Sequence, residues 1–185
     1  MARVNRVAKA AKPNKCGKCG EAIPVGSAYT WWKFRHGGKY VRCLKCPPKG
    51  SDLTQSAFYG TLCDLEERYG AITAEGADPS DVANELNDLA GEARDLGETC
   101  QENLDNMPEG LQQGSTGELL QERVDACESL ADALEDLASQ AENLEAPEEP
   151  EEESGDERNA YDKAREELDT ELRGILDDSP DFSIS

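Results

Sequence analysis

Four cysteines near the start of the chain have the spacing of metal ligands. They form two CxxC pairs separated by 23 residues: Cys16, Cys19, Cys43 and Cys46. Each pair can supply two thiolates to one edge of a tetrahedron, the geometry in which proteins bind Zn²⁺. Because four thiolates leave no open position for water or substrate, the pattern predicts a structural zinc site and not a catalytic one. A redox dithiol would need an alternating α/β pattern around it, and the sequence has none.

The single histidine and the other three cysteines are not expected to bind the metal. If the residues between the CxxC pairs form a hairpin, His36 lies at its turn, about 13 Å from Cys43 by strand rise. The remaining cysteines fall on apolar faces of expected helices, which is typical of small buried thiols: Cys63, Cys100 and Cys127.

The segment between the CxxC pairs predicts a β-hairpin. Gly37-Gly38 has the composition of a two-residue turn, which would place Cys43 opposite Trp32. Side chains alternate across a strand, so Trp32 and Phe34 should cover the zinc. The opposite face would carry two aromatic and three basic residues: Trp31, Lys33, Arg35, Tyr40 and Arg42.

This aromatic and basic face belongs to a larger positive surface. Lys18 and Lys45 extend it, as do four residues of the N-terminal segment: Arg3, Arg6, Lys9 and Lys12. Cations neutralise phosphates, and exposed rings stack on unpaired bases, so the surface predicts binding of DNA or RNA. In the alternative interpretation, Trp31 and Tyr40 pack on the helical half, and the cations contact its acidic faces in the same molecule or in a second copy.

The charge distribution predicts two units of opposite sign. Residues 1–50 contain 12 Lys or Arg and one acid, whereas residues 51–185 contain 7 Lys or Arg and 39 Asp or Glu. A solvated helical surface or adaptation to high salt would explain the acids alone, but not the basic first half. No apolar stretch is long enough to span a bilayer or to form a signal peptide. We therefore expect a soluble cytoplasmic protein with no membrane contact and no structural disulfides.

Changes in amino-acid composition along the chain predict five segments. They are a flexible basic arm (1–15), a four-cysteine zinc-ribbon-like module (16–50), an acidic helical region (51–145), an acidic linker (146–156) and a C-terminal helix with a tail (157–185). Apolar periodicity predicts helices at about 52–69, 116–145 and 157–177. A further long helix should start at Asp78-Pro79-Ser80, with apolar residues from Val82 to Met107. Ser115 and Glu118 have the spacing of a capping box before the helix at about 116–145.

The two long helices carry apolar residues at spacings of three and four, a pattern typical of a coiled-coil seam. Because a short loop joins them, they should fold back as an antiparallel hairpin. The expected fold class is therefore a small β-hairpin module of the zinc-ribbon or treble-clef-like type, followed by an all-α antiparallel helical hairpin or bundle.

Several blocks of the sequence resemble a set of small, zinc-ribbon-containing proteins of tailed phages of actinobacteria. These blocks are MARVNRVAKA, CGKCGEAIPVGSAYTWWKFRHGGKYVRCLKC, SDLTQS and GSTGELLQERVDACE, and the likeness spans most of the chain. The resemblance implies a bacteriophage product made in a bacterial cytoplasm, but it implies no activity.

The first CxxC pair also belongs to a motif, CxxCxxxIxxGxxY, that runs from Cys16 through Ile23 and Gly26 to Tyr29. This motif is similar to the first half of the zinc fingers of poly(ADP-ribose) polymerases, which recognise DNA breaks. Cys43 stands where their third ligand is usually histidine, and the insert here is much shorter. The resemblance therefore does not imply that this protein recognises DNA breaks.

The sequence predicts a non-enzymatic protein, because it contains no nucleophile with a base, no phosphate loop and no distinctive carboxylate pair. The first hypothesis is a zinc module that binds nucleic acid, with acidic helices that make protein contacts. A second is a protein-interaction or host-interference factor that acts through the acidic helices, with the zinc module purely structural. A third is a homo-oligomeric structural component held by the helical seam.

Overall fold

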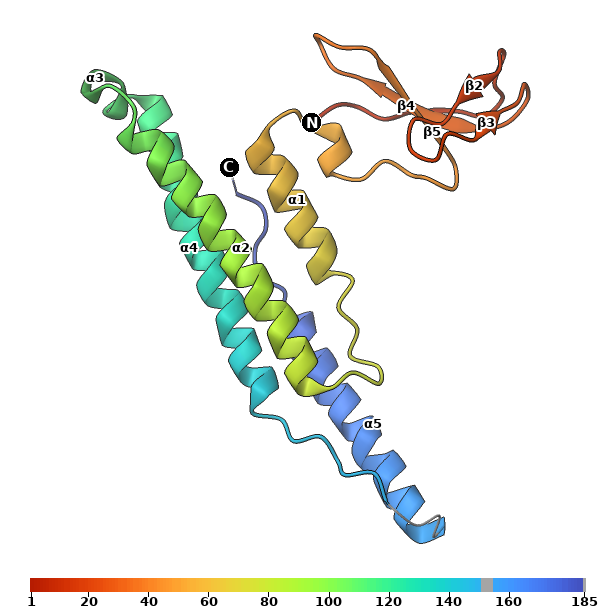
Figure 1. Ribbon diagram of the computed structural model, residues 1–185, viewed down its shortest axis with the longest axis vertical. Helices are drawn as coiled ribbons and strands as arrows, with labels where there is room; N and C mark the ends of the chain where they lie inside the picture. Colours follow the sequence, from red (N-terminus) through yellow and green to blue (C-terminus); the bar gives the residue numbers. More distant parts are fainter. Residues whose placement is uncertain (151–154, 185) are drawn as a thin grey trace. The chain divides into compact units, whose positions relative to one another are not determined.

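A computed structural model describes residues 1–150 and 155–184 of the chain (Figure 1). The chain divides into two compact units, Met1–Asp64 and Leu65–Ser185. Helix α1 (Ala57–Tyr69) begins in the first unit and ends in the second. Among the described residues, none of the helices combines the length and apolarity needed to cross a bilayer.

The first unit is built from short antiparallel strands, followed by a 3-10 turn and the start of α1. One sheet has the strand order β1-β4-β5, and a smaller one pairs β2 with β3. The bounds are β1 Asn5–Val7, β2 Asn14–Lys15, β3 Ala22–Ile23, β4 Tyr29–Lys33, β5 Lys39–Cys43 and η1 Ser51–Leu53. A small antiparallel sheet at the N-terminus, followed by helices, is what the sequence predicts.

The N-terminal segment differs from the mobile arm expected for residues 1–15. Its β1 strand pairs with β4, so that Val7 lies opposite Tyr29. Ala10 is buried, and its N–H donates to the carbonyl of Ser27. The physical reason is that Val7 and Ala10 supply apolar surface to a core too small to be completed without them.

The hairpin formed by β4 and β5 has a different register from the predicted one. Cys43 lies opposite Tyr29 and not opposite Trp32, and residues 34–38 form the connection. A two-residue turn needs positive φ at one or both central positions. The positive-φ glycines of the described residues are elsewhere, so Gly37-Gly38 does not make such a turn.

The register shift exchanges the two faces of the hairpin, because it amounts to an odd number of residues. Trp31 lies on the face of Val41 and Cys43, against the small core around Cys16. Trp32, predicted to cover the metal, lies on the opposite face. There it is only 1% exposed and stacks on the ring of Tyr40, with 5.5 Å between ring centroids.

The second unit is helical and begins within α1. Its other elements are α2 Pro79–Asp105, α3 Glu109–Gln112, α4 Ser115–Glu142 and α5 Gly155–Asp177. The two long helices, α2 and α4, lie side by side and antiparallel (Figure 1). Arg94 of α2 pairs with Asp132 and Glu135 of α4, and Gly97 lies against Cys127, where an added Cβ would come 3.1 Å from the Cys127 Cβ.

The interface between α2 and α4 is made of small and aliphatic side chains. The residues of these two helices that are 0% exposed are Ala83, Leu86, Ala90, Ala93, Cys127, Ala131, Leu134 and Ala141. Alanine and glycine at these positions allow the two backbones to approach closely, and the acidic residues stay on the outer faces. The apolar spacing therefore predicts the positions of the two long helices well.

The ends of the helices show where sequence patterns succeed and fail. Asp78 caps α2, since its carboxylate accepts a hydrogen bond from the N–H of Ser80 at 2.9 Å. The capping box predicted at Ser115 and Glu118 is wrong, because Gly114 is the N-cap of α4 and no side chain caps it. The first predicted helix, about 52–69, is likewise shorter and starts at Ala57, after the 3-10 turn.

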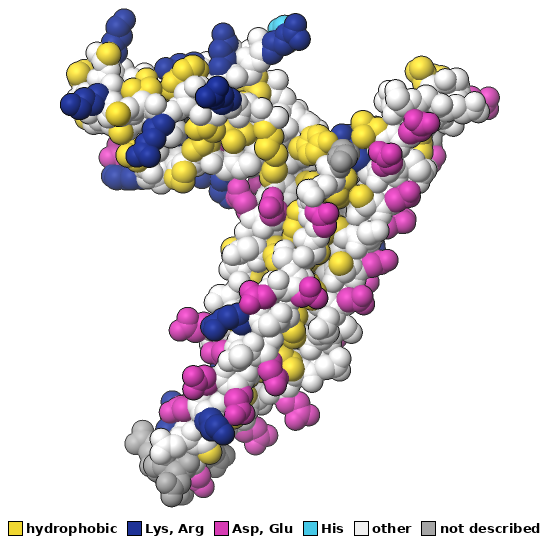
Figure 2. All heavy atoms as spheres, turned by 180° about the vertical axis from the view of Figure 1, so that it is seen from behind, with side chains coloured by type: hydrophobic (Ala, Val, Ile, Leu, Met, Phe, Trp, Pro, Cys, Tyr) yellow, Lys and Arg dark blue, Asp and Glu magenta, His cyan; other side chains and the backbone are white. Residues whose placement is uncertain are grey.

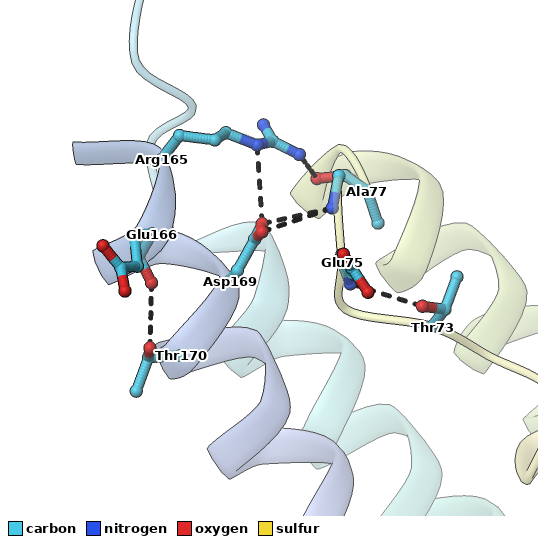
Figure 3. Close-up of polar contacts among 8 residues, drawn as sticks. Thr73, Glu75, Ala77, Arg165, Glu166, Asp169 and Thr170 are labelled. Carbon is cyan, nitrogen blue, oxygen red and sulfur yellow. Dashed lines mark hydrogen bonds and ion pairs between the residues drawn. The ribbon is translucent and has the colours of Figure 1, made fainter. Parts of the chain in front are cut away.

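Helix α5 is fixed to the loop before α2 by two side chains (Figure 3). Asp169 accepts hydrogen bonds from the N–H of Gly76 at 3.3 and 3.4 Å, and Arg165 donates to the carbonyl of Ala77. Arg165 and Asp169 also pair with each other at 3.4 Å. Because both side chains are about 20% exposed, the contacts are partly shielded from solvent.

We predict that Asp169→Ala loosens α5 and lowers the free energy of unfolding of the helical unit by about 1–2 kcal/mol. The substitution removes the acceptor of the Gly76 N–H, and it leaves the Arg165 guanidinium with the Ala77 carbonyl as its remaining partner. Urea denaturation followed by far-UV circular dichroism measures the loss. Glu171→Ala, an exposed change on the same helix, is the matched control. Equal stability of the two variants would contradict the contact.

Candidate metal centre

The four cysteines of the two CxxC pairs meet at one point of the first unit. Their sulfur atoms all lie within 4.8 Å of one another, and the Sγ atoms of Cys19 and Cys43 are 3.8 Å apart. Tetrahedral zinc has Zn–S distances of about 2.3 Å, which corresponds to S···S edges of about 3.8 Å. The cluster therefore has the dimensions needed to hold a metal ion such as zinc.

Different elements bring the two pairs together. The first pair lies in the turn between β2 and β3, and Cys43 is the last residue of β5. The turn is held by Cys16, whose N–H donates to the carbonyl of Glu21 at 2.9 Å. Gly20 closes the turn with a φ of 72°, a conformation that other residues rarely adopt. Gly17 donates to the carbonyl of Val41 at 2.8 Å and so joins this turn to β5.

Backbone amides point at the sulfurs, as they must in a metal-binding turn. The N–H of Cys43 donates to Sγ of Cys16 at 3.4 Å. Burial opposes ionisation of the Cys16 thiol, but this bond and one from the N–H of Cys19 lower its pKa to about 6. Cys16 is thus prepared to act as a thiolate.

The Cys46 thiol of the cluster, unlike that of Cys16, resists ionisation. Partial burial, together with contacts to the sulfurs of Cys19 and Cys43, raises the pKa of the Cys46 thiol to about 12. Four thiols this close cannot all ionise alone, because each thiolate disfavours the next. A divalent cation among them would stabilise all four thiolates together, and this makes the donor set suitable for a metal.

The remaining candidates stand apart from this centre. His36, in the loop between β4 and β5, is not a member of the cluster, as the sequence predicts. Cys63, Cys100 and Cys127 are buried in helices, again as predicted.

Arg42, predicted as a nucleic-acid contact, has structural partners instead. Its side chain is 13% exposed, and its guanidinium pairs with Asp52 at 2.8 Å. The same group lies 5.4 Å from the ring centroid of Trp32, and its Nη1 atom lies 3.1 Å from where a Cβ on Gly17 would be. Arg42 therefore connects the metal-binding turn to the face that carries Trp32.

The other residues predicted to bind nucleic acid are more accessible. Tyr40 is 43% exposed, whereas Trp31 is half-buried beneath Lys39, whose Nζ atom lies 4.6 Å from its ring centroid. Lys45 is exposed but pairs with Glu21 at 3.3 Å. Seven others are exposed and have no ion pair within the part of the chain that the structure describes: Arg3, Arg6, Lys9, Lys12, Lys18, Lys33 and Arg35.

Sequence patterns did not single out two residues of this unit that matter to it, Asp52 and Lys39. Asp52 follows the basic region and gave no signal, because its pairing with Arg42 depends on the fold of the intervening chain. Lys39 also donates a hydrogen bond to the Tyr29 hydroxyl at 3.4 Å, a contact that only the true register reveals.

Comparison of the chain with models of known protein families, with curated proteins and with solved structures gives no match. The resemblances described from the sequence stay predictions.

We predict that removal of the metal unfolds the first unit and spares the helices of the second. A structural zinc ion contributes roughly 10 kcal/mol or more to a module this small, and this module buries little apolar surface of its own. A strong chelator should collapse the dispersion of the Trp31 and Trp32 signals in NMR spectra while most of the helical circular dichroism remains. Unchanged tryptophan signals would contradict the prediction.

We also expect one metal ion per chain, and none in the variant Cys19→Ser. Elemental analysis of the purified protein measures the stoichiometry. Cys100→Ser, which removes a buried thiol from α2, is the matched control and should keep the metal.

For Arg42 we expect a loss of stability. Arg42→Gln removes the partner of Asp52 and the cation over Trp32, which should lower the unfolding free energy of the first unit by about 1–3 kcal/mol. Thermal unfolding monitored by tryptophan fluorescence tests this. Arg35→Gln removes the same charge from an exposed position and should leave the stability unchanged. A fully stable Arg42→Gln variant would make Arg42 a surface contact after all.

Proposed function

We propose that the first unit is a non-enzymatic zinc-binding module of the zinc-ribbon or treble-clef-like type that binds DNA or RNA. The zinc ion is structural and is held by the two CxxC pairs. Four thiols that must stay reduced suit a reducing compartment such as a bacterial cytoplasm, which also fits a phage-encoded product. The helical unit serves protein contacts.

One observation carries the nucleic-acid proposal: the cations of the module are largely unneutralised. Residues 1–64 contain 12 Lys or Arg and three acids, and two of these acids, Glu21 and Asp52, are paired with Lys45 and Arg42. Figure 2 shows basic side chains projecting from this part of the molecule. Unpaired surface cations attract a polyanion and release its counterions on binding.

The acidic surface of the second unit favours a second candidate function. Residues 65–185 contain 37 Asp or Glu and 7 Lys or Arg, and magenta side chains dominate the helices in Figure 2. Such a surface suits a basic protein partner, or it serves a host-interference role. The buried apolar seam between α2 and α4 leaves the acids on the outside, where a partner can reach them.

We predict salt-sensitive binding of the full-length protein to nucleic acid. Fluorescence anisotropy with labelled single-stranded DNA, duplex DNA and RNA should give affinities that fall linearly on a log-log plot against salt. The triple variant Arg6→Gln, Lys9→Gln, Lys12→Gln should reduce the slope by about 1 for each phosphate that the variant no longer binds.

The control is Lys163→Gln with Arg173→Gln, which removes two basic charges from α5 only and should leave the slope unchanged. If none of the three probes binds at low salt, the nucleic-acid proposal fails and the acidic unit becomes the better candidate for the binding function.

A further inference from the structure

The first unit contains an open hollow of about 450 Å³ that the metal centre does not explain. Three segments meet there: the residues before β1, the end of β4 with the loop after it, and the residues after η1. The side chains that matter for binding are those of Arg3, Lys33, Phe34, Arg35, Thr54 and Gln55. Its volume lies in the range of about 300–1,000 Å³ that is usual for small-molecule sites.

The hollow gathers positive charge without neutralising it. Arg3, Lys33 and Arg35 line it, no carboxylate does, and none of the three has an ion pair with any residue among 1–150 and 155–184. Elsewhere in this unit the structure does pair cations, as in Arg42 with Asp52. Like charges held close together are unfavourable unless an anion joins them, so the hollow suits an anionic ligand.

The positions of these cations are set by the fold. Lys33 ends β4 and lies opposite Lys39 of β5. Arg3 follows Ala2, whose N–H donates to the carbonyl of Leu53 at 2.6 Å and so ties the two outer segments of the hollow together. The walls are thus joined by backbone hydrogen bonds, and the cations do not depend on one another for their placement.

Phe34 gives the hollow an aromatic wall. Its ring is half-buried and meets the ring of Tyr40 edge to face, with 5.7 Å between centroids, while Tyr40 stacks on the buried Trp32. A ring anchored in this way can stack on a planar base without reading its identity. Thr54 adds a donor, because its Oγ1 already accepts a bond from the N–H of Ser56 at 3.1 Å and its hydroxyl proton is left to donate to a ligand.

We propose that this hollow takes one nucleotide of single-stranded nucleic acid, with its phosphate on Arg3, Lys33 and Arg35 and its base against Phe34. This inference rests on the proposed nucleic-acid function and makes it more specific. A base inside a duplex is covered on both faces by its neighbours, so it cannot stack on Phe34. The protein should therefore prefer single strands to duplexes, with little preference for sequence.

The test compares full-length, zinc-loaded variants in anisotropy titrations with a labelled oligothymidylate and with a duplex hairpin that has no free end. Phe34→Leu keeps an apolar contact to Tyr40 but removes the stacking ring. It should weaken single-strand binding about tenfold and leave duplex binding unchanged. Unchanged metal content shows that the variant is folded.

A second pair of variants keeps the test valid if Phe34→Leu does not fold. Lys33→Gln with Arg35→Gln removes two charges inside the hollow, and Lys12→Gln with Lys15→Gln removes two exposed charges outside it. The first pair should reduce single-strand affinity several-fold more than the second. Because the change in net charge is equal, a general electrostatic effect would affect both pairs alike.

Each outcome decides between the two proposals. Equal losses for the two pairs, or equal affinity for single strand and duplex, would overturn the hollow as the site while leaving nucleic-acid binding in place. An absence of binding to either probe at low salt would overturn both. A larger loss in the hollow variants, confined to the single strand, supports the inference.

Discussion

The first unit depends on the convergence of four sulfur atoms. Its sheets are short and its core cluster is small, and a unit of this size gains only marginal stability from the apolar surface that it buries. The sulfur cluster joins the turn after β2 to the end of β5, and the amides around Cys16 are already directed at its sulfur. The thiols resist joint ionisation, so a cation placed among the four sulfurs would stabilise the cluster.

Arg42 links the cysteine cluster to the opposite face of the sheet. Its guanidinium lies beside Gly17 of the metal-binding turn, pairs with Asp52 and covers the ring of Trp32. From Trp32 the contact continues through the ring of Tyr40 to Phe34 at the edge of the hollow. The metal centre and the hollow are therefore joined by a continuous series of packed side chains within one unit, and a loosened metal site should disturb the hollow as well.

The sequence predicts chemistry better than register. CxxC spacing identifies the four cysteines that meet in the structure because each pair must lie within one turn, which is a local property. The hairpin register is not local: Gly37-Gly38 suggests a tight turn, but the stacking of Trp32, Tyr40 and Phe34 accompanies a longer connection. Since side chains alternate, this register error exchanges the expected faces of Trp31 and Trp32. The partial burial of Arg42 is missed for a different reason, because its pairing with Asp52 depends on the fold of the intervening chain. The helices were predicted better because their apolar spacing repeats over many residues, whereas the cap at Ser115 depended on a single position.

Because the two units carry opposite net charges, a polyanion that approaches the chain meets both attraction and repulsion. The module of residues 1–64 attracts it, while the 37 acids of residues 65–185 are tethered in the same molecule and repel it or compete with it. A tether keeps the competing carboxylates at a high effective concentration, whatever the arrangement of the units. Salt screens the attraction and the competition together, so the salt dependence of the full chain should be shallower than the number of cations in the module suggests. A ligand that also stacks on a ring gains affinity from a contact that the acids cannot imitate. A chain that joins a basic module to an acidic unit should therefore favour nucleic acids with unpaired bases over polyanions that have no ring to stack.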